Sequence, residues 1–132
     1  AEARRNGYVR CLSGRIRYIG GINSTHEAVR AEGCRFAFST KIQEGAQLIA
    51  KIAEAWIWNH IVHPSILRGE NIEPLMQVHD ALLLELPPKH LKRVHRQMVY
   101  AMTKVPAHLL SVPIETNGDY GQNLADMVPI DG

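Results

Sequence analysis

The sequence has little that would support a disulfide, a zinc site or a membrane anchor. Among its 132 residues are only two cysteines, Cys11 and Cys34, and their separation matches no metal-ligand spacing. We therefore expect reduced thiols, as in an intracellular protein. No run of about 18 apolar residues occurs, and the chain does not start with a cleavable signal pattern. These absences predict an intracellular location and no membrane partner.

The net charge is also low, at +2, but it is unevenly distributed. Residues 1–41 contain eight basic and three acidic side chains, a local charge of +5, and the remainder carries −3. A basic segment suits contact with phosphate groups, because each cation that meets a phosphate releases condensed counterions. A solvated charged surface is the alternative explanation, since charge alone does not identify a partner.

The first half of the chain predicts a short ribbon followed by helices. Residues 1–6 are typical of a helix end stopped by Gly7, and residues 8–18 are rich in β-formers on both sides of Ser13-Gly14. Ser24 and Glu27 have the spacing of a capping box. Apolar periodicity then predicts two helices, over 25–38 and 42–61, with the second ended by His63-Pro64 and followed by a loop to Pro74.

The second half predicts a hairpin, a helix and a strand. Residues 75–86 fit strand, turn and strand if His79-Asp80 lies at the bend. A helix should follow from Pro87-Pro88 to Thr103, with Lys89, Lys92, Arg93 and Arg96 facing water. Residues 110–116 are predicted as a last strand. The expected fold class is α+β, with an antiparallel hairpin and a strand packed with three helices.

Asp80 is the most informative residue, because a carboxylate within the apolar stretch 75–86 is costly to bury without a partner. It could occupy a solvated turn, where aspartate is common. It could also be a metal ligand, since Mg²⁺ prefers carboxylate oxygens and keeps waters and substrate phosphates in its shell. His79 beside it could donate a hydrogen bond to a sugar or phosphate oxygen, although a lone histidine is more often structural.

Several segments, in order along nearly the whole chain, resemble family A DNA polymerases. Gln77-Val78-His79-Asp80 followed by Leu82-Leu83-Leu84-Glu85 is similar to the third conserved motif of that family, a hairpin with His-Asp at its tip. Further matching segments are Gly7-Tyr8-Val9-Arg10, Leu12-Ser13-Gly14-Arg15-Ile16-Arg17-Tyr18, Ile22-Asn23-Ser24, Arg30-Ala31-Glu32, Arg35-Phe36-Ala37-Phe38, Ile42-Gln43-Glu44-Gly45-Ala46, Ser111-Val112-Pro113-Ile114-Glu115 and Gly121-Gln122-Asn123.

The resemblance implies that residues 1–132 are the C-terminal part of a polymerase palm. Asp80 is then one of two catalytic aspartates that hold two Mg²⁺ ions, and His79 contacts the primer terminus. Gln43 reaches the minor-groove edge near the terminal base pair, where every correct pair presents acceptors. Arg35 lines the same groove, while Arg15 and Arg17 hold the backbone of the primer-template DNA. Arg10 and Arg30 are weaker candidates for such contacts.

The chain departs from the family pattern at single positions. Ala81 stands where the family has an accessory glutamate, and Ser13 stands where it has phenylalanine. Ser39 replaces asparagine, Lys41 replaces proline, and Glu44-Gly45 replaces Gly-Thr.

The larger departure is that the first aspartate motif and the fingers helix, which binds the deoxynucleoside triphosphate, have no counterpart here. We therefore expect no polymerisation by the chain alone. A second polypeptide, as in a split polymerase, or the rest of a longer protein would supply the missing parts. A phage or prophage origin and a cytoplasmic or nucleoid-associated location are further expectations.

Three other readings remain open at the level of sequence. The chain could be a non-catalytic DNA-binding or scaffold remnant of the same fold, which Ala81 and the missing parts favour. It could be a metal hydrolase using His60, His63 and His79, since the first two are three residues apart on a helix end. A single-subunit RNA polymerase has a similar His-Asp hairpin, but residues 7–18 and 42–46 match the DNA enzyme better.

Overall fold

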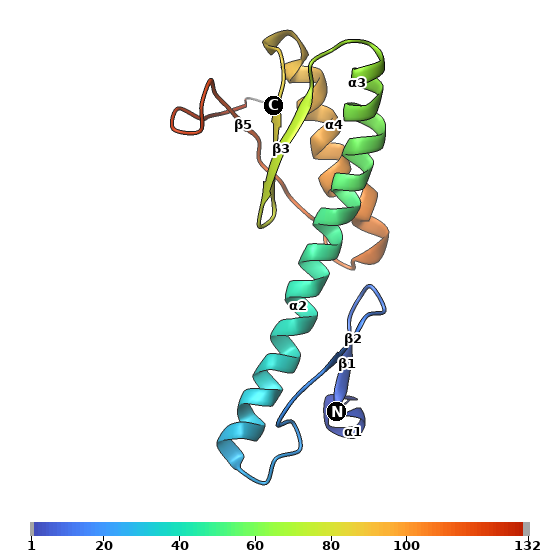
Figure 1. Ribbon diagram of the computed structural model, residues 1–132, viewed down its shortest axis with the longest axis vertical. Helices are drawn as coiled ribbons and strands as arrows, with labels where there is room; N and C mark the ends of the chain where they lie inside the picture. The colour runs from blue at the N-terminus through green and yellow to red at the C-terminus, as the bar shows by residue number, and fades with distance from the viewer. Residues whose placement is uncertain (1, 131–132) are drawn as a thin grey trace. The chain divides into compact units, whose positions relative to one another are not determined.

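The computed structural model describes residues 2–130, which fall into two compact units that divide between Leu48 and Ile49 (Figure 1). Helices and two-stranded antiparallel sheets make up both units, so the predicted α+β class is confirmed. In the described residues, no helix is both long enough and apolar enough to cross a membrane.

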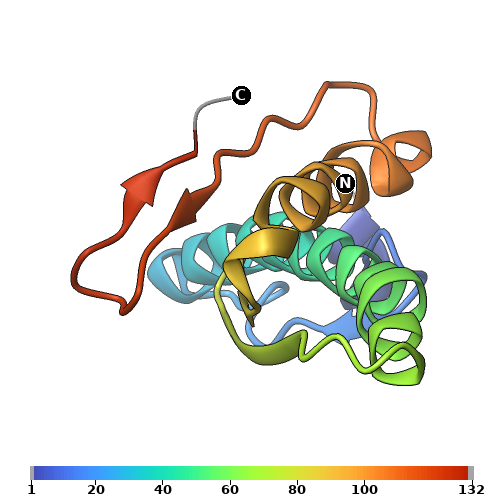
Figure 2. The same cartoon turned by 90° about the horizontal axis from the view of Figure 1, so that it is seen from above.

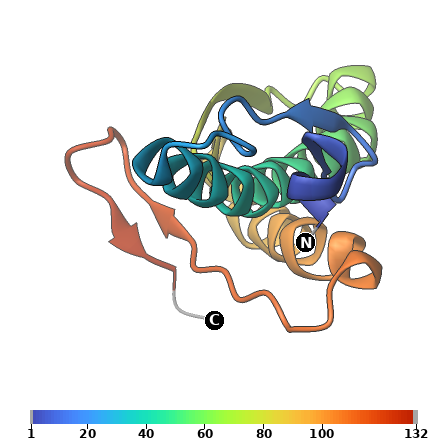
Figure 3. The same ribbon diagram turned by 90° about the horizontal axis from the view of Figure 1, so that it is seen from below.

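The first unit opens with the predicted helix end and ribbon. Helix α1 (Glu2–Asn6) stops at Gly7, whose φ of 75° is the left-handed conformation that glycine adopts at little cost. Ala1 lies outside the described residues. Strands β1 (Tyr8–Arg10) and β2 (Ile16–Tyr18) pair antiparallel. Buried Val9, Ile19 and Ile22 pack with Ala37 of the following helix, so the core of this unit holds the ribbon beside that helix. Figure 3 shows the backbone of these segments.

Helix α2 (Glu27–Ile57) is one continuous helix, and the predicted break between residues 38 and 42 is wrong. The sequence there contains no glycine or proline, and Lys41 can donate the backbone N–H that a proline would lack. The predicted capping box is also wrong. The Ser24 hydroxyl accepts a hydrogen bond from the backbone N–H of His26 at 3.1 Å, which makes a local turn, and the helix begins only at Glu27.

The predicted helix end at His63-Pro64 is wrong as well. After α2 the chain continues as a π-helical turn (Trp58–Val62) and then as α3 (His63–Leu67). Pro64 lies in the first turn of α3, where a missing N–H costs little. Within the wider turn, the side chains of Asn59 and His60 bond the carbonyl oxygens of Ala55 and Trp56 at 2.8 and 2.9 Å. The predicted loop therefore shrinks to the few residues after Leu67.

The second unit contains the predicted hairpin and its supporting helix (Figure 2). Strands β3 (Glu73–Val78) and β4 (Ala81–Glu85) pair antiparallel, with a register shift between Pro74 and Met76. After a 3-10 turn (Pro88–His90), α4 runs over Leu91–Thr103 as predicted. Leu82 and Leu84, on one face of β4, pack against a core formed by Ile57, Ile61, Val62, Ile72, Val94 and Ala101. This core fixes the hairpin against the helices.

The predicted strand over residues 110–116 is wrong. After a 3-10 turn (Val105–Leu109), this segment is extended but joins no sheet among the described residues. The last paired strands are β5 (Asp119–Tyr120) and β6 (Val128–Pro129), which form a small separate hairpin (Figure 2). A strand needs a neighbour to accept its backbone hydrogen bonds, and local sequence does not report whether one is present.

Three charged side chains tie the turn after α3 to α4. Both Arg68 and Arg93 donate to the Glu70 carboxylate, Arg68 at 2.9 and 3.0 Å and Arg93 at 2.7 Å. Arg93 is therefore half-buried in an ion pair instead of facing water as predicted. Hydrogen bonding from Arg68 lowers the pKa of Glu70 to about 2, against the opposing effect of burial, and Arg93 adds to the lowering.

We expect this ion pair to make stability depend on pH in the acid range. The folded-state pKa of Glu70 is below its ordinary value of 4.5, so the ion pair stabilises the fold above that pH. The contribution is lost as the pH falls from 4.5 toward 2. Urea unfolding followed by tryptophan fluorescence should show a smaller acid loss of stability in Glu70→Gln than in the wild type. Glu85→Gln, at an exposed carboxylate, is the matched control; equal acid losses in all three proteins would contradict this role.

Candidate functional site

The tip of the β3–β4 hairpin presents His79 and Asp80 to solvent. Val78 and Ala81 are paired, so these two residues form the whole turn. The Gln77 side chain donates a hydrogen bond to the His79 carbonyl oxygen at 2.9 Å and braces the turn. Asp80 is exposed, and no residue in the described part of the chain forms a hydrogen bond or ion pair with its carboxylate. Its oxygens are therefore available to a ligand.

The backbone at this tip is strained. His79 has a φ of 55°, and it is the one non-glycine residue between Glu2 and Ile130 with a positive φ. Two-residue hairpin turns favour positive φ because it matches the twist of the strands. For a residue with a Cβ, the left-handed conformation costs about 1–2 kcal/mol. Residues held in such sparsely populated conformations are concentrated at active sites and ligand-binding segments.

We expect substitutions of His79 to show how much its positive φ costs in free energy of unfolding. His79→Gly should leave the free energy of unfolding unchanged or raise it, because glycine adopts positive φ freely. His79→Val should lower it by about 1–2 kcal/mol, since a β-branched residue is least tolerant of this conformation. Urea unfolding curves measure both. A glycine variant less stable than the valine variant would show that the imidazole itself stabilises the turn.

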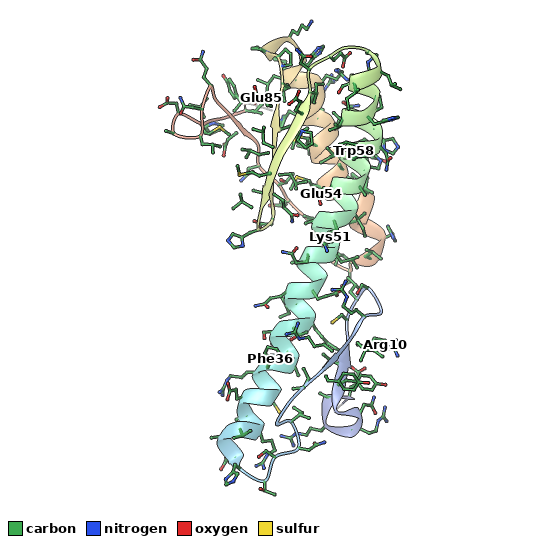
Figure 4. The ribbon with its side chains drawn as sticks, viewed as in Figure 1. Arg10, Phe36, Lys51, Glu54, Trp58 and Glu85 are labelled. Carbon is green, nitrogen blue, oxygen red and sulfur yellow. The ribbon has the colours of Figure 1, made fainter. Side chains whose placement is uncertain are left out.

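In the first unit, Arg17 of β2 and Gln43 of α2, both predicted to contact DNA, lie on the same side of α2. The Arg17 guanidinium lies over the Phe36 ring, 5.1 Å from its centroid. Phe36, labelled in Figure 4, is 43% exposed. Exposed Gln43 follows seven residues later, about two helical turns, and so lies on the same face as Phe36. A cation, an aromatic ring and an amide thus face solvent together.

The other arginines of this unit differ in their roles. Arg15 and Arg35 are exposed, on the ribbon turn and on α2. Arg10 donates to the Gly14 carbonyl oxygen at 3.2 Å, and Arg30 donates to the Ser24 carbonyl oxygen at 3.0 Å. These two arginines therefore brace the backbone of the ribbon and of the turn before α2.

The family model for DNA polymerase family A matches residues 1–126 of this chain. The chain belongs to DNA polymerase family A. It is 34% identical over 122 residues to a thermostable DNA polymerase I of Thermus thermophilus, covering 92% of this chain and 14% of that protein. It is 35% identical over 128 residues to DNA polymerase I of Geobacillus stearothermophilus, covering 95% of this chain and 14% of that protein. The chain therefore spans a small part of these relatives.

A solved structure of a polymerase POL domain has a similar arrangement. The POL domain of Pol1 from M. smegmatis, in complex with DNA primer-template and dNTP, superimposes with a TM-score of 0.69 at 28% identity. The match covers 86% of this chain and 19% of that one. The α+β arrangement of this chain thus resembles part of that POL domain.

Other features of this family A segment were missed or misread from sequence. The Phe36 ring under Arg17 and the Gln77 brace were not predicted, although both side chains stand within the matching motifs. The three-histidine metal site is wrong, because residues 2–130 contain no cluster of three potential metal ligands. His60 instead stacks on Trp56, with 4.3 Å between ring centroids. The hollow between the hairpin and α2, rimmed by Glu54 and Trp58 (Figure 4), measures about 50 Å³, too small for a substrate pocket.

Proposed function

We propose that this chain forms part of a DNA-directed DNA polymerase, as residues 1–132 of the C-terminal palm region, acting inside the cell. The observation that carries the proposal is the hairpin tip, which holds Asp80 exposed and unpaired on a braced two-residue turn. Relatives named DNA polymerase I match along nearly the whole chain, and the structural neighbour is a complex with primer-template and dNTP. These support templated nucleotidyl transfer.

In this proposal Asp80 is one ligand of the Mg²⁺ ions that the family uses. Its carboxylate oxygens fit the preference of Mg²⁺ for hard ligands, and an ion of this kind commonly takes one or two carboxylates together with phosphate oxygens and water. Asp80 would help to hold this Mg²⁺, which would supply Lewis-acid stabilisation of the charge on the reacting oxygens. The second carboxylate comes from outside this chain, from the remainder of a longer protein or from a second polypeptide.

The other proposed roles follow from position and chemistry. His79, beside Asp80 at the tip, donates to the primer terminus. Gln43 and Arg35 of α2 contact minor-groove acceptors, which every correct base pair presents in the same places. Arg15 and Arg17 of the ribbon contact phosphates, and the Phe36 ring limits where the Arg17 guanidinium can go.

Primer extension tests this proposal. The complete polymerase, with this chain in place, should incorporate deoxynucleotides opposite a template when Mg²⁺ is present, and residues 1–132 alone should not. Ala81, in the place of the family glutamate, together with the motifs missing from this chain, favours a non-catalytic DNA-binding remnant. Binding of primer-template without extension by the complete protein would support that second function and reject the first.

A further inference from the structure

Two residues that depart from the family pattern touch each other in the first unit. The Ser13 hydroxyl, in the ribbon turn, donates a hydrogen bond to Oε1 of Glu44 on α2. The same hydroxyl oxygen accepts a hydrogen bond from the backbone N–H of Arg15 at 3.3 Å. One side chain therefore links α2 to the backbone of a residue expected to contact DNA.

The turn around Ser13 is closed by its own backbone. The Cys11 N–H donates to the Arg15 carbonyl oxygen at 2.8 Å, and the Gly14 N–H donates to the Cys11 carbonyl oxygen at 3.0 Å. Gly14 has a φ of 84°. Because the turn is closed in this way, an attachment at Ser13 restrains Arg15 as well.

The ribbon is attached to α2 at two places. Arg17 lies over Phe36 at one end, and Ser13 bonds Glu44 at the other. Arg15 lies between the two attachments, while Gln43 immediately precedes Glu44 on the helix. The hydrogen bond to Glu44 thus fixes the position of Arg15, which is expected to contact a phosphate, relative to Gln43, which is expected to contact the minor groove.

The second oxygen of the Glu44 carboxylate, Oε2, makes the hydrogen bond from Ser13 important for keeping Glu44 in place. Oε2 is buried and has no hydrogen-bond donor in the part of the chain that the structure describes. Glu44 as a whole is half-buried, so removal of the Ser13 hydroxyl leaves a partly desolvated carboxylate without the hydrogen bond that Ser13 donates. The Ser13 hydroxyl therefore lowers the free-energy cost of placing the Glu44 carboxylate at this position.

We propose that Glu44, acting through Ser13, is a positioning residue that holds Arg15 where it can contact a phosphate of the bound duplex. This inference rests on the proposed function, because it needs Arg15 to contact DNA. Neither residue touches the reacting atoms. Loss of the pair should therefore weaken primer-template binding and leave the chemical step unchanged.

The salt dependence of DNA binding tests the proposal in the complete polymerase. Neutralising one phosphate-contacting arginine lowers the slope of log affinity against log salt by about 0.9. Arg15→Ala should do so in the wild type and in Ser13→Thr, which keeps the hydroxyl. In Ser13→Ala the same arginine substitution should change the slope by much less. Glu44→Ala is a second disrupting variant, which also removes the buried oxygen and so does not depend on Ser13→Ala folding well.

Steady-state kinetics separate positioning from catalysis. In Ser13→Ala we expect the KM for primer-template to rise about 5-fold, the equivalent of one ordinary hydrogen bond, with kcat unchanged. Ser111→Ala, at an exposed serine of the second unit, should match the wild type.

Two outcomes overturn the inference in distinguishable ways. If Arg15→Ala lowers the salt slope equally in the wild type, Ser13→Ala and Glu44→Ala, Arg15 contacts DNA without help from the pair. If the wild-type polymerase binds no primer-template, the proposed function itself fails and the inference fails with it.

Discussion

Replacing Asp80 by asparagine should lower the rate of primer extension by about 10³-fold and leave the fold intact. Asparagine keeps the size of the side chain but removes the negative charge with which a carboxylate attracts Mg²⁺. Stabilisation by a bound metal is worth several kcal/mol, and each 1.36 kcal/mol corresponds to a tenfold change in rate. The measurement is single-turnover extension of a labelled primer by the complete polymerase at saturating deoxynucleotide.

Stability should not change in this variant. Asp80 is exposed and has no partner among residues 2–130, so the free energy of unfolding should stay within about 0.5 kcal/mol of the wild type. Asp119→Asn, at another exposed aspartate, is the matched control and should keep full activity. Wild-type extension by Asp80→Asn would reject the role of this carboxylate and, with it, the proposed catalytic function.

Replacing Ile61 by alanine should lower the free energy of unfolding by about 2–5 kcal/mol. Ile61 is completely buried, in the π-helical turn between α2 and α3, and it packs in the same core as Ile72 and Val94. The substitution removes buried apolar surface and leaves a cavity that the helices on either side cannot readily close. A domain of this size has only about 5–15 kcal/mol to lose.

Urea unfolding followed by tryptophan fluorescence measures this effect. Both tryptophans of the chain, Trp56 and Trp58, stand within five residues of Ile61, and Trp56 packs against its core. Leu67→Ala is the control, because Leu67 is 76% exposed on the neighbouring α3. A cost as small for Ile61 as for Leu67 would show that the core is not packed as described. Since Leu82 and Leu84 of the hairpin pack there too, Ile61→Ala should also loosen the tip and slow extension.

The sequence predicted those parts of the structure that depend on neighbouring residues. The hairpin of residues 75–86, with His79 and Asp80 in its turn, and the helix ending at Thr103 are both confirmed. Alternating apolar residues and a proline at a helix start act within a few residues, so the chain itself reports them. The polymerase family is confirmed for the same reason, because its motifs are short and occur here in order.

The errors arose where an element depends on a partner strand or on packing that lies far away in the sequence. Residues 110–116 have the composition of a strand, but no strand among the described residues pairs with them. The helical path continues past its predicted end at Pro64, because this proline lies in the first turn of α3, where its missing N–H costs little. In both cases a local rule was overridden by the surrounding structure. The roles of Arg15, Arg17, Arg35 and Gln43 in DNA binding stay predictions.

By itself, the sequence determined the kinds of element, the position of Asp80 at a turn and the family. Only the tertiary structure decided which side chains meet. The Arg93–Glu70 ion pair joins residues 23 apart, and the Ser13–Glu44 hydrogen bond joins residues 31 apart. Propensity and periodicity reach only a turn or two along the chain, whereas such pairs form because buried cores bring separate elements together. The positive φ of His79 was likewise decided by the closing of two strands around it.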